Sequence, residues 1–418
     1  MCLVVSLLGV LVLLGLAWML STNRQAIAWR TVLGALFLQA LIGGWVLVMP
    51  SGIATLEAVS AGVGQVLAYS REGIEFMFGW SANGAMGSLA ASIEAKGFAP
   101  IFAVNVLPVI VIFSALVSVL YHFGIMGWTI RLLGGALQRV LGTSRPESLS
   151  AAANVFVGQA EAPLVARPFI PTMTASELFA IMVGGLASIA GSVMAGYAAM
   201  GIELKYLIAA CFMAAPGGLL MAKMVMPETE QPKNDLAELD DLESMKSVNL
   251  FDAAASGALS GMHIALAVGA MLVAFIALMA MVNGLLGALG GLIGYPELTL
   301  ELILGWVFQP LAWVLGVPWA EAEAAGSFIG QKLVLNEFVA YLSFTEQRAA
   351  FAPLSQAIIT FALCGFANFS SIAILLGGLG SVAPNRREDI ARFGLRALLA
   401  ATLANLMSAA LAGFYLSL

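Results

Sequence analysis

Apolar stretches near 20 residues in length recur from one end of the chain to the other, separated by short polar segments. About 20 apolar residues form a helix long enough to cross about 30 Å of hydrocarbon, and the alternation typical of membrane β-strands is missing from the pattern. The pattern predicts an all-α polytopic membrane protein with eight transmembrane helices. The predicted spans are residues 3–20, 31–49, 100–123, 178–200, 206–226, 263–289, 354–379 and 393–418.

Three further segments are not predicted to be simple spans. Residues 50–97 are weakly amphipathic and carry several carboxylates, which favours a helix lying in the membrane interface. Residues 300–317 are apolar but contain Pro310, which indicates a partial or broken span. Residues 228–246 are almost entirely polar and are predicted to form a cytoplasmic linker.

Composition excludes a soluble protein. Of the 418 residues, 61% are hydrophobic and 10% are charged, and a soluble fold could not bury that much apolar surface. The first apolar stretch has no basic residue before it and no small-residue cleavage pattern after it, so we expect it to be retained as a helix. Cys2, Cys211 and Cys364 lie far apart and show no spacing typical of a metal site or a disulfide framework.

Basic residues near the span ends predict the orientation. Lys and Arg in short loops remain on the cytoplasmic side. Three basic clusters fall on one side of the membrane if odd-numbered spans run inward, and both termini are then predicted to be periplasmic. The clusters are Arg24 and Arg30; Arg131, Arg139 and Arg145; and Arg386, Arg387 and Arg392.

Two segments, 147–174 and 320–345, are too polar to span the membrane and too apolar to be ordinary loops. Each is long enough for a re-entrant helical hairpin that enters and leaves on the same side, as in many transporter binding sites. Each is followed by a span rich in small residues, "GGLASIAGSV" and "CGFANFSSIAILLGG". Aligning residues 188–190 with residues 371–373 makes the two units internal repeats, and the predicted topology makes them inverted, which favours alternating access.

Glu161 and Glu337 place one carboxylate in each predicted hairpin, at a depth where a charged group is unfavourable. A carboxylate inside a membrane costs about 2.5–3.5 kcal/mol on insertion scales, so each needs a partner or an aqueous cavity. They are either ligand-binding groups or structural acids paired with Arg167 and Lys332. Similarly, Asn368, Ser370 and Ser371 are either binding residues or helix-packing residues. The chain has no nucleotide-binding loop, zinc-protease motif or nucleophile elbow, and we predict that it is not an enzyme.

Four motifs in order resemble one family. "GQAEAPLVARPF", "GGLASIAG", "NEFVAY" and "CGFANFSSIAILLGGLGS" are similar to those of the concentrative nucleoside transporters, specifically the bacterial sodium-coupled symporters. The resemblance covers essentially the whole chain. It implies eight transmembrane helices, an interfacial helix and two re-entrant hairpins in each protomer of a homotrimer in the bacterial inner membrane. It also implies a transport domain that slides past a fixed scaffold, in the manner of an elevator.

The resemblance also implies roles for particular residues. Gln159 and Glu161 would bind the nucleobase between Val193 and Phe366, and Glu337, Asn368 and Ser371 would bind the ribose. No cofactor is expected. Sodium, as the coupling ion, would be held by the side chains of Asn154 and Ser188 and the carbonyl oxygens of Val157 and Ile189. Ala160 stands where bacterial relatives typically have threonine, which leaves the preference between purine and pyrimidine bases open. No nucleic-acid polymer is expected as a partner.

The predicted division of the chain separates scaffold from transport repeats. The parts are N-terminal helices (1–145), first hairpin and following helices (146–226), polar linker (227–250), scaffold helix and connection (251–317), second hairpin and following helix (318–382), and C-terminal helix (383–418). Three alternatives remain open. They are proton-coupled nucleoside symport with Glu161 or Glu337 as the proton carrier, a membrane-embedded enzyme that uses these two residues as acid and base, and a passive channel.

Overall fold

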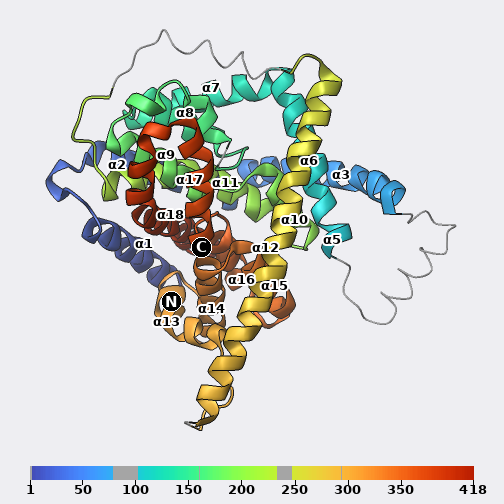
Figure 1. The fold of residues 1–418 in the computed structure, drawn as a ribbon. Coiled ribbons are helices and arrows are strands. Elements are labelled where there is room, and N and C mark those ends of the chain that lie inside the picture. Colours follow the sequence, from blue (N-terminus) through green and yellow to red (C-terminus); the bar gives the residue numbers. More distant parts are fainter. Residues whose placement is uncertain (1, 79–101, 160, 233–246, 293) are drawn as a thin grey trace.

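The computed structural model describes residues 2–78, 102–159, 161–232, 247–292 and 294–418, and every regular element within these ranges is a helix (Figure 1). Among the described residues, six helical stretches are long and apolar enough to cross a membrane, and up to seven if the bent pair α13 and α14 counts as one span. The all-α architecture expected from the apolar pattern is therefore observed. The count of eight spans stays a prediction, because the helices in two of the eight segments are shorter than a full span.

The N-terminal part begins with two apolar helices and a long helix that follows them. Its elements are α1 (Cys2–Met19), η1 (Arg24–Ala26), α2 (Trp29–Leu47), α3 (Pro50–Phe78), α5 (Phe102–Asn105), α6 (Leu107–His122) and α7 (Ile125–Leu141). In Figure 1 α3 runs across the view whereas α6 runs down it, the orientation expected of an interfacial helix. The remainder of the predicted interfacial segment, residues 79–97, lies outside the described residues.

The middle of the chain contains the first predicted hairpin and the most deeply buried helices. Its elements are α8 (Arg145–Ala153), η2 (Ala162–Ala166), η3 (Ile170–Thr172), α9 (Ala175–Ala187), α10 (Gly191–Ala199) and α11 (Leu204–Val225). The helices α9, α10 and α11 are almost wholly buried. They form the centre of the bundle together with the C-terminal helix.

The C-terminal part contains a long exposed helix, the second predicted hairpin and a second broken helix. Its elements are α12 (Leu250–Leu292), α13 (Leu300–Val314), α14 (Trp319–Val334), α15 (Glu337–Gln347), η5 (Arg348–Ala350), α16 (Pro353–Leu363), α17 (Phe369–Val382), η6 (Pro384–Arg386) and α18 (Arg387–Leu416). Most of α12 faces outward, whereas α18 is buried along most of its length.

Two expectations about individual helices need correction, and one helix was not predicted. The segment 125–141, for which no element was predicted, is a helix, α7. Pro310 does not break its segment, because α13 continues through it, and the chain instead bends by 117° between α13 and α14. The helix α12 begins at Leu250, well before the predicted span that starts at residue 263.

The two hairpin segments enter the bundle from opposite ends. Figure 1 places α8 near the top of the molecule and α14 near the bottom. The connection that follows α8 consists of 3-10 turns, whereas α14 and α15 are regular helices separated by Leu335 and Asn336. This opposite placement is the arrangement expected of inverted repeats.

Each hairpin is followed by a helix that is interrupted in its middle. The first interruption, Ser188 to Ala190, is extended and separates α9 from α10; the second, Cys364 to Asn368, separates α16 from α17. The predicted register of the repeats is therefore wrong. Ser371 lies in the first turn of α17 rather than in a break, so the breaks correspond at Ser188 and Cys364, the residues that end α9 and α16.

A buried ion pair fixes the base of the first hairpin. The Lys223 ammonium lies 2.7 Å from the Glu147 carboxylate, and it donates a hydrogen bond to the Ser176 hydroxyl at 3.0 Å. Glu147 also accepts from the Ser144 amide, and Glu177 accepts from the Thr174 amide, so one carboxylate caps the first turn of α8 and the other that of α9. Lys223 thus connects the end of α11 to the starts of α8 and α9.

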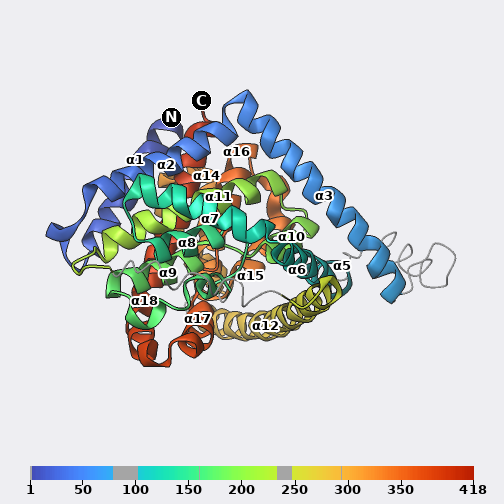
Figure 2. The same cartoon turned by 90° about the horizontal axis from the view of Figure 1, so that it is seen from above.

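The two chain ends lie close together. Both views place the N and C labels side by side (Figures 1 and 2), and α1 packs along α18. The two ends of the chain therefore lie near one another. That both ends face the periplasm stays a prediction.

Candidate functional site

A cavity of about 370 Å³ lies where the two hairpin segments, the two helix breaks and α12 meet. All seven residues predicted to bind substrate line it: Gln159, Glu161, Val193, Glu337, Phe366, Asn368 and Ser371. They come from positions more than 200 residues apart in the chain, so the fold gathers what the sequence leaves scattered. The roles assigned to them individually stay predictions.

Glu337 lies at the start of α15 and is held by two neutral donors. The Tyr197 hydroxyl donates to its Oε1 at 2.9 Å, and the Asn368 amide donates to its Oε2 at 2.9 Å. The positive end of the α15 dipole also favours a carboxylate at this position. Lys332 is not its partner, so Glu337 is not the lysine-paired structural acid that the sequence left open.

Asn368 joins this carboxylate to the second helix break. It is the N-cap of α17, where its Oδ1 accepts from the Ser371 amide at 2.9 Å and from the Ser370 hydroxyl at 2.7 Å. Both its side-chain atoms are therefore used, and their positions are fixed. The side chains of all three polar residues of the "NFSS" motif face the cavity, so helix packing alone does not account for them.

The first hairpin contributes an amide and a carboxylate. Gln159 rests against Gly185, where an added Cβ would approach the Gln159 Cβ to 3.1 Å, and its Oε1 is buried without a hydrogen-bond partner. Glu161 is exposed to cavity space, and in the described part of the chain it forms no ion pair with Arg167 or any other basic side chain. An intramembrane carboxylate was expected to have either a charged partner or a cavity, and Glu161 lies in a cavity.

Other residues of the cavity were not singled out in the sequence. One wall is formed by α12 through His263, Ile264 and Met271, and Tyr197 lies behind Glu337. His263 carries no sequence signal, because a single histidine in an apolar helix belongs to no motif. Tyr197 could not have been found from spacing, since its only distinguishing feature is the contact with Glu337.

The four predicted sodium ligands lie where the tip of the first hairpin meets the break between α9 and α10. Asn154 is 1% exposed, and neither its Oδ1 nor its Nδ2 has a hydrogen-bond partner; Nδ2 rests over Gly184. In the described residues, the carbonyl oxygens of Val157 and Ile189 accept no hydrogen bond, whereas those of their neighbours Phe156 and Ser188 do.

This set of donors fits a small hard cation. Such ions take oxygen ligands from amide side chains, hydroxyls and backbone carbonyls. A buried amide oxygen without a partner is costly, and a bound cation would remove that cost. Ser188 donates to the Gly185 carbonyl at 3.4 Å, which leaves the lone pairs of its oxygen available. Sodium at this site would be a transported ion rather than a resident metal of the protein.

Direct backbone hydrogen bonds connect the two breaks and the hairpin tip. The Phe366 amide donates to the Ser188 carbonyl at 3.1 Å, and the Gly191 amide donates to the Phe156 carbonyl at 2.9 Å. Ser188 is a predicted ion ligand and Phe366 a predicted wall of the substrate cavity. The two predicted sites are therefore one hydrogen bond apart.

Asn405 of α18 forms hydrogen bonds to both helix breaks. Its Nδ2 donates to the Ala187 carbonyl at 2.6 Å and to the Cys364 carbonyl at 2.9 Å, which are at the ends of α9 and α16. Its Oδ1 accepts from the Lys332 ammonium at 2.7 Å, and Lys332 also donates to the Ala362 carbonyl at 2.9 Å. A side chain at Gly365 would collide with this amide, so the close approach requires glycine.

Ala160, which departs from the pattern expected at the hairpin tip, lies outside the described residues. The base preference that it leaves open stays a prediction.

Comparisons with known families cover most of the chain. Residues 206–413 match the family described as Na+ dependent nucleoside transporter C-terminus, and residues 8–81 match its N-terminus. Residues 103–203 match a family described as nucleoside recognition.

Individual relatives agree with these matches. An uncharacterized transporter of Haemophilus influenzae is 55% identical over 99% of this chain and 98% of its own length. The nucleoside permease NupC of Helicobacter pylori is 48% identical over 99% of this chain and 98% of its own length. CNTnw in an inward-facing, substrate-bound state has a TM-score of 0.94 at 53% identity, covering 100% of this chain and 98% of that chain.

Replacing Asn405 with leucine tests whether the amide bridge holds the breaks. The substitution keeps the branched shape of the side chain but leaves the Ala187 and Cys364 carbonyls without the Asn405 donor, and it removes one of the two oxygen partners of the Lys332 ammonium. Each buried group left unpaired costs about 1–3 kcal/mol, so we expect a clear fall in the thermal unfolding midpoint of the detergent-solubilised protein. The matched control is Thr402→Val, because the Thr402 hydroxyl bonds only the Leu398 carbonyl of its own helix. Equal midpoints for both variants would contradict the bridging role.

Proposed function

The chain belongs to the Na+-dependent nucleoside transporter family, and on this premise we propose that it imports nucleosides by sodium symport through an elevator type of alternating access. Its relatives are permeases, and transport rather than catalysis is the activity of the family. The proposal concerns the substrate, the coupling ion and the mechanism in this chain.

The observation that carries the proposal is the shared cavity. Residues from both hairpin segments and both helix breaks line one space of about 370 Å³. Its polar groups suit a nucleoside, because vicinal ribose hydroxyls can donate to the Glu337 carboxylate and exchange hydrogen bonds with Asn368 and Ser371. Gln159 and Glu161 offer acceptors and donors for the edge of a base, and Val193 and Phe366 offer apolar walls for its faces.

Sodium would couple to the nucleoside through the hairpin tip. The proposed ion ligands Asn154 and Val157 precede Gln159 and Glu161 by only a few residues, so an ion that orders the tip also orders the base-binding groups. A free energy of coupling between two sites is reciprocal, so nucleoside binding must raise the affinity for sodium by the same factor.

The ion gradient is sufficient for concentrative uptake. One sodium ion that crosses about 100 mV releases about 2.3 kcal/mol. A tenfold concentration gradient adds about 1.4 kcal/mol. With one sodium per nucleoside, the sum supports accumulation on the order of several hundredfold.

The moving and fixed parts would follow the burial pattern. We assign the hairpin segments and the buried helices around the two breaks to the transport domain, and the N-terminal helices together with α6 and α12, which pack on each other, to the scaffold. Large apolar side chains remain exposed on α2 and α12, including Phe37, Leu266 and Leu285. In a homotrimer in the bacterial inner membrane, neighbouring protomers and lipid would cover these faces.

The decisive experiment is uptake of radiolabelled uridine into proteoliposomes. One arm has an inward sodium gradient and the other an equal choline gradient at the same pH. We expect concentrative uptake in the sodium arm alone. Equal uptake in both arms that depends on a pH gradient would assign the coupling to protons, and uptake that never exceeds equilibrium would indicate a passive channel.

Replacing Glu337 with glutamine tests ribose recognition. A hydrogen bond to a charged group contributes about 1.5–3 kcal/mol, so we expect uridine to bind about 10- to 100-fold more weakly, with little change for free uracil, which lacks ribose. Isothermal titration in detergent with sodium present measures both ligands. Glu297→Gln is the matched control, because Glu297 is exposed and lies outside the cavity. Equal losses for uridine and uracil would refute the assignment of ribose to Glu337.

Replacing Asn154 with alanine tests the ion site. Loss of one oxygen ligand should move the sodium activation curve of uridine uptake to concentrations roughly ten times higher, while a saturating sodium concentration restores much of the rate. Asn23→Ala serves as the control, because Asn23 is exposed and its side chain forms no cap hydrogen bond. An unchanged sodium activation curve in Asn154→Ala would place the ion elsewhere.

A further inference from the structure

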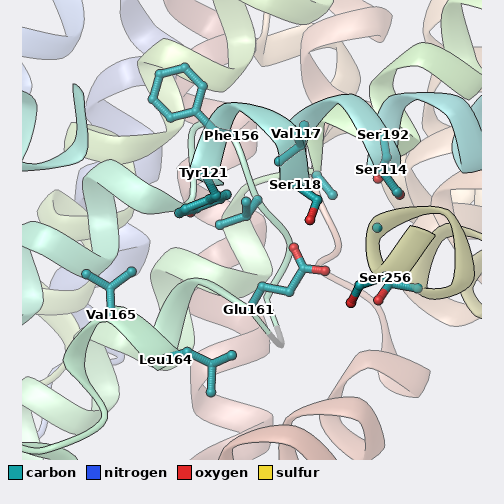
Figure 3. A pocket seen from close by; sticks show the side chains of 14 residues that line it. Ser114, Val117, Ser118, Tyr121, Phe156, Glu161, Leu164, Val165, Ser192 and Ser256 are labelled. Carbon is teal, nitrogen blue, oxygen red and sulfur yellow. The ribbon is translucent and has the colours of Figure 1, made fainter. Parts of the chain in front are cut away.

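A second cavity, of about 210 Å³, adjoins the first and is lined by serine hydroxyls. It lies between α6, the first hairpin, the start of α10 and the first turns of α12. Its hydroxyl-bearing residues are Ser114, Ser118, Tyr121, Ser192, Ser256 and Ser260. Glu161 and Ala190 line both cavities, so the two spaces meet at the Glu161 side chain. Figure 3 shows the Glu161 carboxylate pointing into the second cavity, toward the side of Ser118 and Ser256.

The serines are presented as two facing pairs. Ser114 and Ser118 are one turn apart on α6, and Ser256 and Ser260 are one turn apart on α12, so each pair lies on one face of its helix. The glycines that follow the α12 serines allow the helices to approach closely. A Cβ added at Gly257 would lie 2.6 Å from the Ser118 Cβ. The close crossing therefore keeps all four serines around the same space.

The serine hydroxyls of this cavity form no hydrogen bond to any other group in the described residues. A serine or threonine in an apolar helix normally donates to the carbonyl four residues earlier, as Thr129, Thr402 and Ser408 do here. No hydrogen bond in the described part of the chain uses the side chain of any of the five cavity serines, although Ser192 is only 6% exposed. The five hydroxyls around this space are therefore available to a ligand that enters it.

The charge of the lining restricts the ligand. Glu161 is the one carboxylate among the lining residues, and no basic side chain is among them. A phosphorylated ligand would meet a carboxylate without a compensating cation, whereas neutral hydroxyls can donate to Glu161 and exchange hydrogen bonds with the serines. The lining thus favours an uncharged polyhydroxylated group.

We propose that this cavity is a second nucleoside subsite, which takes the ribose of the transported nucleoside after it leaves the main cavity. The inference rests on the function proposed above. Along α12 the subsite residues 256 and 260 precede the main-cavity residues 263–271, so the subsite lies nearer the end of α12 that follows the predicted cytoplasmic linker. Glu161 remains in contact with the ligand throughout the transfer, because it belongs to both cavities.

The double substitution S118A/S256A tests the subsite by separating turnover from binding. Each hydrogen bond lost on the release route should lower the maximal rate of sodium-driven uridine uptake by about fivefold. The dissociation constant of uridine in detergent should change by less than about twofold, since the main-cavity ligands remain. S381A/S417A is the matched control, because these hydroxyls already bond carbonyls of their own helices outside both cavities. A maximal rate equal to that of the control would overturn the proposal.

Deoxynucleosides distinguish recognition of ribose from a packing defect. If the serines contact ribose hydroxyls, S118A/S256A should slow uridine more than 2′-deoxyuridine or 3′-deoxyuridine, whichever lacks the contacted hydroxyl. Equal fold-losses for all three substrates would assign the serines to helix packing and overturn the proposal. If the wild-type protein shows no sodium-driven uridine uptake in the same vesicles, the proposed function itself fails, and the two failures are thus distinguishable.

Thiol labelling tests occupancy without relying on turnover. In a protein carrying Cys2→Ser and Ser118→Cys, the remaining cysteines, Cys211 and Cys364, are buried. A polar thiol reagent should label the position-118 thiol, and D-ribose should slow the labelling whereas uracil should not. Ser381→Cys, which is exposed away from the cavity, should label at the same rate with either probe. Labelling at position 118 that ribose leaves unchanged would contradict the subsite.

Discussion

The structure depends on the satisfaction of backbone hydrogen bonds where two buried helices are interrupted. A membrane interior offers no water to an unpaired amide or carbonyl, and each such group costs several kcal/mol there. The breaks after Ala187 and after Leu363 therefore exist only because other parts of the protein supply partners. Asn405 donates to one carbonyl at each break, and the Phe366 amide donates to the Ser188 carbonyl across the gap between them. The two breaks are consequently a single hydrogen-bonded unit.

The predicted ion site and part of the substrate cavity contain polar groups that this unit leaves without partners. The carbonyls of Val157 and Ile189, both side-chain atoms of Asn154 and the Oε1 of Gln159 have no partner in the described chain, although their neighbours do. Unpaired buried polar groups are rare in folded proteins and each calls for an explanation. These particular groups lie together at the tip of the first hairpin, where a cation and a polar ligand together would satisfy them. The groups that folding leaves unpaired are therefore the same groups that we propose bind the transported ion and substrate.

The sequence predicted the parts of this arrangement in which a charged residue stands in an apolar segment. Glu161 and Glu337 stand out because a carboxylate in an apolar chain requires a partner or an aqueous cavity. The polar segments around them were therefore predicted to be hairpins. Asn405 and Tyr197 are single polar residues in apolar helices, and only the folded structure shows which carbonyls or carboxylate they contact. The repeat register was misplaced because similar short motifs were aligned, whereas the breaks occur where tertiary partners exist. The free serines of α6 and α12 likewise resemble ordinary packing residues until their hydroxyls are found without partners.

The two hairpin segments differ in a way that supports our proposal of an ion at the first. In the second segment, α14 and α15 are regular helices, and Asn336 caps α15 through a hydrogen bond from the Val339 amide at 2.9 Å. The first segment leaves α8 through 3-10 turns, which have poorer hydrogen-bond geometry. Asn336 thus fixes the start of the second helix of this hairpin, whereas in the described chain the first hairpin retains unpaired side-chain groups of Asn154 and Gln159 at its tip. A cation can shift a conformational equilibrium only by binding one state better than another. A bound ion would stabilise the tip of the first hairpin more than the second hairpin. We therefore place the coupling between sodium and substrate in the first hairpin, while the second hairpin supplies fixed contacts.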